Sequence, residues 1–135
     1  MKQLFKRLPR NKHSRAQGQY WEQQAAKYLQ QQGLRIVECN YHSRYGEIDL
    51  IAIDNEQYVF IEVRARKDLR FGRPSETVSA NKQAKIMKTA QAYLQQHKLD
   101  VSCRFDVVEV VLSADTGKAS CHWIPQAFDG HGEYA

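Results

Sequence analysis

The stretch "GEIDLIAIDNEQYVFIEVRAR", residues 46–66, decides the fold because it consists of two apolar runs on either side of a polar dipeptide. Both runs are rich in Ile and Val, which favour strands. Asn55 and Glu56 form the shortest turn available between them, and a symmetric hairpin around this turn pairs residues whose numbers sum to 111. We therefore predict a β-hairpin over these residues.

Charged side chains interrupt both apolar runs. In the predicted register Asp49 faces Glu62 and Glu47 faces Arg64, and the two-residue period of a strand places all four on one face. Glu47 and Arg64 alone are adequately explained as a cross-strand ion pair. Two opposed carboxylates are different, because they repel each other unless a cation lies between them. The hairpin therefore predicts a divalent-cation site at Asp49 and Glu62.

The rest of the chain supplies helices and further strands. Apolar positions recur at helical spacing over residues 16–32, and Gly33 provides a helix stop. A second helix is expected to begin at Ser79 or Asn81, either of which can cap it, and to end near His97. Strands are expected over 34–43 and 101–112, with a last strand or extended segment over 119–128. The order α-β-β-β-α-β predicts an α/β fold, a mixed β-sheet flanked by helices.

Size and charge restrict the classes of function. The 135 residues suit one domain, over 16–128, between a flexible basic arm (1–15) and a flexible tail (129–135). A net charge of +5 favours polyanionic partners, with nucleic acid ahead of a membrane surface. The arm holds six Lys or Arg and no apolar run long enough for a membrane span. Three widely separated cysteines indicate neither a disulfide framework nor a zinc site, so we expect a cytoplasmic protein.

Residues of the two predicted helices are further candidates for this site. Glu22 shares a helical face with apolar residues, which directs its carboxylate toward the core, although a border position reaching water explains it equally well. Gln83 lies on the apolar face of the second helix, with Lys82 and Lys85 to the side. The Gln is a candidate for the site and the lysines for phosphate contacts, but ordinary solvated positions explain them too.

Five motifs in order carry a family resemblance: "GQYWEQQAAKYLQQQG", "YGEIDLIAID", "VFIEVRAR", "FGRPSETVSANKQAKI" and "RFDVVEV". Together they resemble the small bacterial YraN family of predicted endonucleases, over about Gly18 to Phe128. That family is placed in the restriction-endonuclease-like superfamily, the PD-(D/E)XK nucleases, and is most similar there to the archaeal Holliday-junction resolvases. The resemblance implies a restriction-endonuclease-like core.

The resemblance also implies roles for individual residues. Asp49 matches the aspartate of the nuclease motif, Glu62 its second acid, and Glu22 the acid on the first helix; these would hold Mg²⁺ or Mn²⁺. Gln83 matches a glutamine that some branches use near the site. Arg64 stands where lysine is usual, and because arginine stays protonated it cannot act as a general base.

Two functions follow from this resemblance. The first is a metal-dependent endonuclease acting on DNA, with branched or structured DNA among its candidate substrates. The alternative is a catalytically weak or inactive nucleic-acid-binding or adaptor protein that keeps the nuclease fold, which Arg64 favours. We expect DNA as the partner and no membrane, with a homodimer left open. The phosphate-binding residues would be Arg66, Lys67, Arg70, Arg73, Lys82 and Lys85.

Overall fold

The computed structural model describes residues 15–66 and 78–129. Its elements are α1 (Arg15–Gln31), β1 (Arg35–Ser43), β2 (Gly46–Asp54), β3 (Gln57–Arg66), α2 (Ala80–Gln96), β4 (Cys103–Leu112) and β5 (Ala119–Phe128). This order confirms the predicted α/β fold, and the last segment is a strand. Residues 1–14 of the predicted basic arm and residues 130–135 of the predicted tail lie outside the described residues, while Arg15, assigned to the arm, begins α1 instead.

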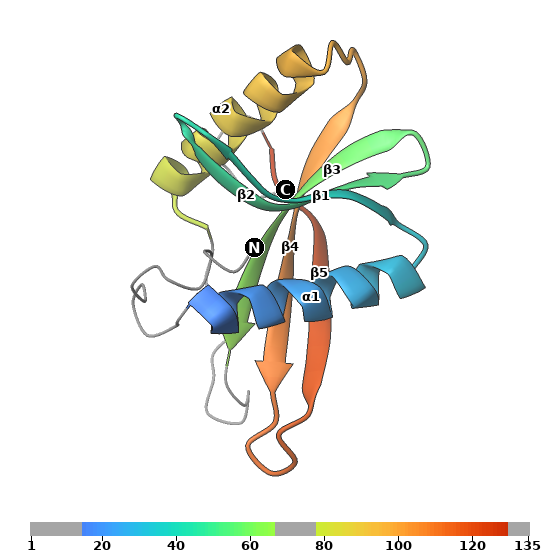
Figure 1. Ribbon diagram of the computed structural model, residues 1–135, viewed down its shortest axis with the longest axis vertical. Helices are drawn as coiled ribbons and strands as arrows, with labels where there is room; N and C mark the ends of the chain where they lie inside the picture. The colour runs from blue at the N-terminus through green and yellow to red at the C-terminus, as the bar shows by residue number, and fades with distance from the viewer. Residues whose placement is uncertain (1–14, 67–77, 130–135) are drawn as a thin grey trace.

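All five strands form one mixed sheet in the order β1-β2-β3-β4-β5 (Figure 1). Neighbouring strands run antiparallel except β3 and β4, which are parallel. A parallel pair needs a crossover connection, and the segment that contains α2 provides it. The sheet therefore changes from an antiparallel hairpin to a parallel pair at β3.

The β2–β3 hairpin has the register that its sequence predicts. Pairing begins with Asp54 opposite Gln57 and continues to Leu50 opposite Ile61, so paired numbers sum to 111 as expected. Asn55 in the turn has a φ of 61°, and asparagine tolerates this left-handed conformation better than most residues. The tight turn thus fixes which residues of the two strands meet.

Beyond Leu50 and Ile61 the two strands separate. The beginning of β2 stays paired with β1 as far as Gly46, while the end of β3 stays paired with β4 as far as Arg66. Figure 1 shows these two ends diverging like the arms of a fork, and both helices begin on the side toward which the fork opens. We call this place, between residues 46–49 of β2 and 62–66 of β3, the strand fork.

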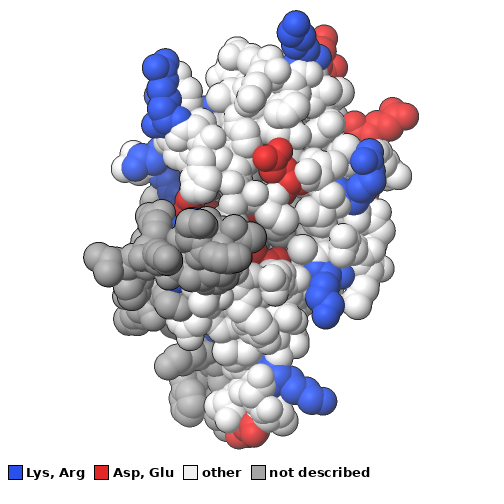
Figure 2. Space-filling model, in the orientation of Figure 1, with Lys and Arg blue, Asp and Glu red and all other residues white. Residues whose placement is uncertain are grey.

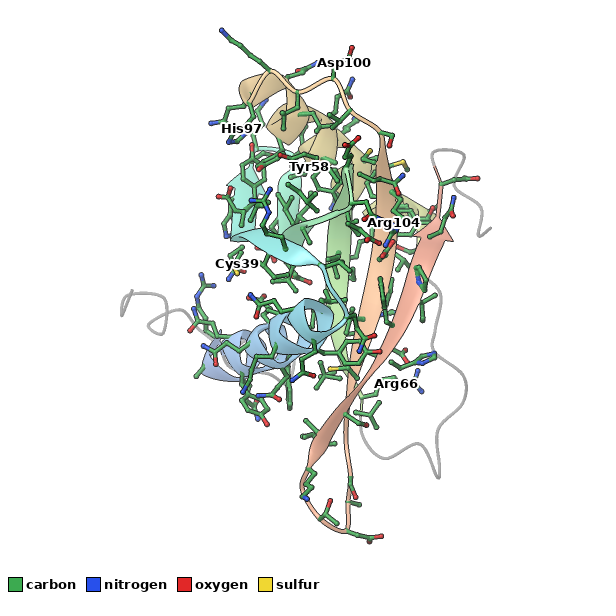
Figure 3. The ribbon with its side chains drawn as sticks, turned by 90° about the vertical axis from the view of Figure 1, so that its right-hand side faces the viewer. Cys39, Tyr58, Arg66, His97, Asp100 and Arg104 are labelled. Carbon is green, nitrogen blue, oxygen red and sulfur yellow. The ribbon has the colours of Figure 1, made fainter. Side chains whose placement is uncertain are left out.

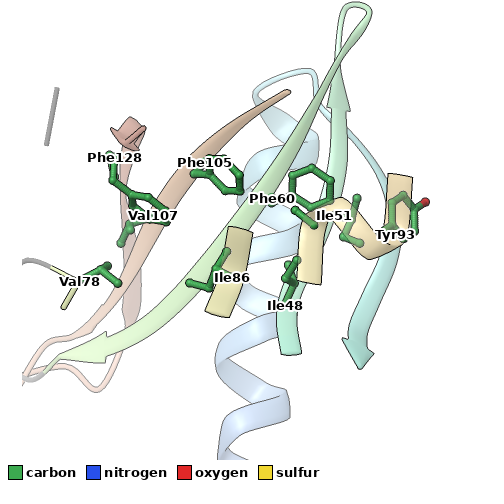
Figure 4. Packing of buried hydrophobic residues seen from close by; sticks show 11 residues of the cluster. Ile48, Ile51, Phe60, Val78, Ile86, Tyr93, Phe105, Val107 and Phe128 are labelled. Carbon is green, nitrogen blue, oxygen red and sulfur yellow. The ribbon is translucent and has the colours of Figure 1, made fainter. Parts of the chain in front are cut away.

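Each face of the sheet is covered by one helix. Trp21, Ala25 and Leu29 of α1 pack against one face of the sheet. On the opposite face α2 covers a second core; Figure 4 shows Ile48, Ile51, Phe60, Val78, Ile86, Tyr93, Phe105, Val107 and Phe128 packed there. The result is a three-layer helix–sheet–helix arrangement. Neither described helix is long and apolar enough to cross a membrane.

A buried carboxylate fastens β4 to its neighbours. Asp106 is 0% exposed and accepts hydrogen bonds from the Arg104 guanidinium, from Trp123 Nε1 and from the backbone N–H of Gln126. Arg104 also donates to Asp54 at 3.0 Å, which ties β4 to the hairpin. Figure 3 shows Arg104 on the sheet, well away from Arg66, which is the last residue of β3. Because every partner comes from the sheet itself, this network is structural.

Candidate metal centre

Asp49 lies at the strand fork and takes part in its backbone hydrogen bonding. Its Oδ2 accepts a hydrogen bond of 2.8 Å from the backbone N–H of Val63 on β3. A strand amide that has lost its ladder partner needs another acceptor, and here a side chain supplies it. The carboxylate is thereby fixed between the two diverging strands.

Glu22 reaches the same place from α1. Its Oε1 accepts a hydrogen bond of 2.8 Å from Asn40 Nδ2. Glu22 also lies close enough to Asp49 for each carboxylate to shift the pKa of the other. Asn40 has a φ of 54°, and it stands opposite Asp49 because Cys39–Leu50 and Tyr41–Ile48 are paired on either side. Asn40, whose backbone has a left-handed conformation in β1, therefore holds the Glu22 carboxylate of α1 beside the Asp49 carboxylate of β2.

The electrostatics of these carboxylates show how closely they are placed. Burial raises the pKa of Glu22 from its ordinary 4.5 to about 7, although the hydrogen bond from Asn40 opposes the shift. Burial also raises the pKa of Asp49 well above its ordinary value, and repulsion from Glu62 and Glu22 raises it further. Negative charge at the fork is thus unfavourable unless a cation balances it.

Glu62 completes the set of acids from β3, and it has a cation of its own. Lys82 Nζ lies 2.7 Å from Glu62 Oε2; the Glu62 side chain is 11% exposed and that of Lys82 is 55% exposed. Burial lowers the pKa of Lys82. The charge of Glu62, the hydrogen bond that Lys82 donates to Glu62 and the charge of Asp49 outweigh this effect, so that the pKa is raised. Lys82 is therefore firmly protonated at this site.

Neither predicted facing pair, Asp49 with Glu62 or Glu47 with Arg64, belongs to the ladder between β2 and β3, which ends at Leu50 and Ile61. Asp49 and Glu62 still lie close enough for the charge of Glu62 to raise the pKa of Asp49. Glu47 lies 3.3 Å from His42 of β1 instead. Arg64 pairs in register with Glu109 of β4, and its charge opposes that of Lys82, which places it near the amine. The symmetric hairpin fails here because the strands separate.

Gln83 is a buried residue of the first turn of α2, and it anchors the beginning of that helix. It is 1% exposed, and its Nε2 donates to the backbone carbonyl of Val78 at 2.8 Å. Within residues 15–66 and 78–129 its Oε1 has no hydrogen-bond partner. We predicted that Gln83 lies near the metal site, and this stays a prediction.

The predicted phosphate-binding residues have different environments. Arg66 Nη1 lies 3.3 Å from the carboxylate of Glu109, whose side chain is 3% exposed, so that Arg66 neutralises a buried acid. Lys85 is exposed on α2. Figure 2 shows acidic side chains near the middle of one face, with Lys and Arg side chains projecting mainly around its outline. The remaining predicted phosphate contacts, Lys67, Arg70 and Arg73, lie outside the described residues.

The donors at the fork suit a hard divalent cation. Glu22, Asp49 and Glu62 offer carboxylate oxygens, the ligands that Mg²⁺ and Mn²⁺ prefer. In the part of the chain that the structure describes, no three acidic, His or Cys side chains enclose a metal ion by themselves. A cation held here would keep water or phosphate oxygens in its shell, as Mg²⁺ usually does.

Sequence reasoning missed one member of the site and one contact. Lys82 was predicted to contact phosphates, but its contact with Glu62 was not foreseen. Asn40 was not a candidate, although it positions Glu22. The capping residue Ser79 indicated where α2 begins but not how the helix is oriented against β3. The only sequence signal for Asn40 was an asparagine in the middle of a predicted strand.

Comparison with known proteins places the chain in a family. The family model "Uncharacterised protein family UPF0102" matches residues 21–110. A UPF0102 protein of Chromohalobacter salexigens is 47% identical over 88% of this chain and 95% of its own. One from Nitrosomonas europaea is 44% identical over 80% of this chain and 89% of its own, and one from Colwellia psychrerythraea is 43% identical over 88% and 93%. The chain therefore belongs to the UPF0102 family, and the YraN family predicted from its motifs is confirmed.

Proposed function

We propose that this protein is a cytoplasmic, Mg²⁺- or Mn²⁺-dependent endonuclease that hydrolyses phosphodiester bonds of DNA. The observation that carries the proposal is the convergence of Glu22, Asp49 and Glu62, from a helix and two strands, at the strand fork. Stability alone does not favour such a cluster, because each carboxylate makes the ionisation of its neighbour harder. A cation-dependent activity explains why the acids are kept together.

The metal and the protein have separate tasks in this proposal. A bound Mg²⁺ or Mn²⁺ would supply Lewis-acid chemistry, lowering the pKa of a water molecule and neutralising charge that develops at phosphorus. Asp49 and Glu62 would hold the ion. Glu22, which is hydrogen-bonded to Asn40, would orient the attacking water. Arg64 keeps its charge throughout and would stabilise the negative charge of the transition state.

DNA is the substrate that the charge of the molecule favours. The chain has a net charge of +5, so its affinity for DNA would come from phosphate contacts with little sequence preference. Lys85 on α2 and the predicted contacts Lys67, Arg70 and Arg73 would bind phosphates on either side of the scissile bond. The family resemblance adds branched DNA to the substrates worth testing.

A DNA-binding adaptor without cleavage is the second candidate. One observation favours it: the Lys82 amine already balances the charge of Glu62, so the fork does not depend on a metal ion for all of its charge compensation. Arg64 at the usual position of lysine points the same way. The adaptor and the nuclease therefore share DNA binding and differ in cleavage.

Cleavage assays on matched DNA substrates separate these functions. Purified protein is incubated with linear, nicked, flapped and four-way DNA in Mg²⁺, Mn²⁺ or EDTA. The nuclease predicts metal-dependent cleavage that Asp49→Asn abolishes and that Glu56→Gln, an exposed acid in the hairpin turn, leaves intact. Binding to these substrates without cleavage in either metal would support the adaptor instead.

A further inference from the structure

Lys82 is positioned by the beginning of α2. Ser79 caps this helix, and its Oγ accepts a hydrogen bond of 3.1 Å from the backbone N–H of Lys82. A cap of this kind fixes the first helical turn relative to the preceding chain. The side chain then extends from the helix to Glu62 on β3, where its Nζ lies 2.7 Å from Oε2. The amine is therefore held at the fork by the helix start and by a carboxylate.

The ion pair differs from an ordinary surface salt bridge. Most surface pairs contribute little because water solvates both partners. Here the Glu62 side chain is 11% exposed, so that its carboxylate has lost most of its water, while the Lys82 side chain is 55% exposed. Asp49 also attracts the amine and Arg64 repels it. Lys82 thus belongs electrostatically to the acid cluster and still has access to solvent.

We propose that Lys82 is a catalytic residue of this centre, serving as the counter-ion of Glu62 before metal binds and contacting the reacting phosphate afterwards. The inference rests on the proposed nuclease function. It goes beyond the phosphate contact predicted from sequence, which named neither Glu62 nor the reacting phosphate as a partner of Lys82.

The Lys82 amine and a divalent cation would compete for the Glu62 carboxylate, and this competition would move the amine toward the phosphate. The Lys82 ammonium would be repelled by a divalent cation that Glu62 and Asp49 hold, and its side chain can move because more than half of it is exposed. The phosphate of a bound substrate would then bring negative charge to the place that the amine leaves. An ammonium group offers three donors in a compact point charge, which suits a non-bridging phosphate oxygen. The role requires no proton transfer by Lys82.

Lys85 is the matched control for this proposal. It lies one turn further along α2, is exposed and has the same charge and length. Lys82→Gln and Lys85→Gln therefore remove equal charge from the same helix. Lys82→Arg keeps the charge at the fork and serves as the conservative variant.

The experiment has two readouts on the full-length protein. The first is the cleavage rate with enzyme and metal saturating, compared with the DNA dissociation constant measured in Ca²⁺. The second is the affinity for Mn²⁺ alone, measured by calorimetry without DNA. Thermal melts confirm that each variant is folded at the assay temperature.

Lys82→Gln is expected to lower the saturated cleavage rate by about 100-fold, in the range found when a donor to a transition state is removed. Its DNA affinity should fall no more than that of Lys85→Gln, and its saturated cleavage rate should fall much further than the rate of that variant. Mn²⁺ should bind Lys82→Gln several-fold more tightly than the parent, because no ammonium competes for Glu62. Lys82→Arg should retain more activity than Lys82→Gln.

A parent-like rate for Lys82→Gln at saturation, with only weaker DNA binding, would overturn the catalytic role. An unchanged or weaker Mn²⁺ affinity in that variant would overturn the counter-ion role, and a lower melting temperature as its sole effect would show a structural salt bridge. If the parent binds Mn²⁺ and cleaves no DNA, the nuclease proposal fails together with the phosphate contact. The Mn²⁺ titrations then still decide whether Lys82 competes at Glu62.

Discussion

Asp49 Oδ2 accepts a hydrogen bond of 2.8 Å from the backbone N–H of Val63, at the place where β2 and β3 separate. This one contact gives the carboxylate a structural role beside the metal-binding role that we propose for it. Its Oδ2 completes the backbone hydrogen bonding of the fork, and the charges of Glu62 and Glu22 lie close enough to raise its pKa. The two roles respond differently to substitution, because an amide oxygen accepts a hydrogen bond but is a poor substitute for a charged metal ligand.

Asp49→Asn should therefore preserve the fold and lose the metal. The amide keeps the shape and an acceptor for Val63, and it removes repulsion among the acids, so the metal-free variant should be as stable as the parent or more stable by about 1–2 kcal/mol. It should lose most of the stabilisation that Mn²⁺ gives the parent, about 3 kcal/mol at a hundredfold excess over the dissociation constant. Thermal melts with and without Mn²⁺ measure both effects.

Asp106→Asn provides the opposite case among the acids of the sheet. Its carboxylate is 0% exposed and is bonded to Arg104, Trp123 and Gln126. Removing its charge leaves the guanidinium without its buried anion, so we expect a loss of about 3–5 kcal/mol in unfolding free energy. Chemical denaturation should show the same loss with and without Mn²⁺. A loss that Mn²⁺ reverses would instead place Asp106 in the metal centre.

The pH dependence of stability should reveal Glu22. Its pKa is about 7 in the folded protein against an ordinary 4.5, so between these values the folded state binds more protons than the unfolded state. Unfolding free energy therefore falls as pH rises through this window and levels off above it. The full shift corresponds to about 3 kcal/mol, and solvent screening of a partly exposed group reduces this to about 1–2 kcal/mol.

Glu22→Gln isolates that contribution from the other titrating groups. Denaturant unfolding in EDTA at pH 5 and pH 8 should show a smaller loss of stability for the variant than for the parent. Saturating Mn²⁺ should flatten the profile of the parent in the same window, because the ion favours the deprotonated carboxylates. Equal slopes for parent and variant without metal would contradict the assigned environment of Glu22.

Substitutions at Arg64 test the departure from the usual nuclease motif. Arg64→Lys restores the usual residue and should keep or raise metal-dependent cleavage. Arg64→Ala removes a cation that would stabilise transition-state charge and should lower the rate by about 10- to 100-fold. Single-turnover rates at saturating enzyme give the comparison. If the Lys and Ala variants cleave equally poorly while the parent is active, the site requires the planar guanidinium group of arginine with its two parallel donors.

The sequence predicted the fold well because its signals were local. The dipeptide Asn55–Glu56 fixed the hairpin register, and Ser79 capped α2 as expected. Asp49 and Glu62 were recognised because a pair of acids in an apolar hairpin conflicts with burial. These features depend on residues close together in sequence.

The rest of the centre depends on geometry between distant elements. The separation of β2 and β3 follows from the pairing of β3 with β4, which a hairpin pattern does not contain. Because the two strands separate, Glu47 contacts His42 and Arg64 lies opposite Glu109. The contact of Lys82 with Glu62 needs the orientation of α2 across the sheet. Helical spacing shows which side chains share a face and not what that face meets.

Anomalous diffraction from crystals grown with Mn²⁺ tests the central claim most directly, because it locates the ion itself. The account predicts a single strong peak at the strand fork, bonded by carboxylate oxygens of Asp49 and Glu62, with the Lys82 amine displaced from Glu62. The peak should be absent from crystals of Asp49→Asn grown in the same way. Parent crystals with no peak at the fork at millimolar Mn²⁺, and Lys82 still bonded to Glu62, would contradict it.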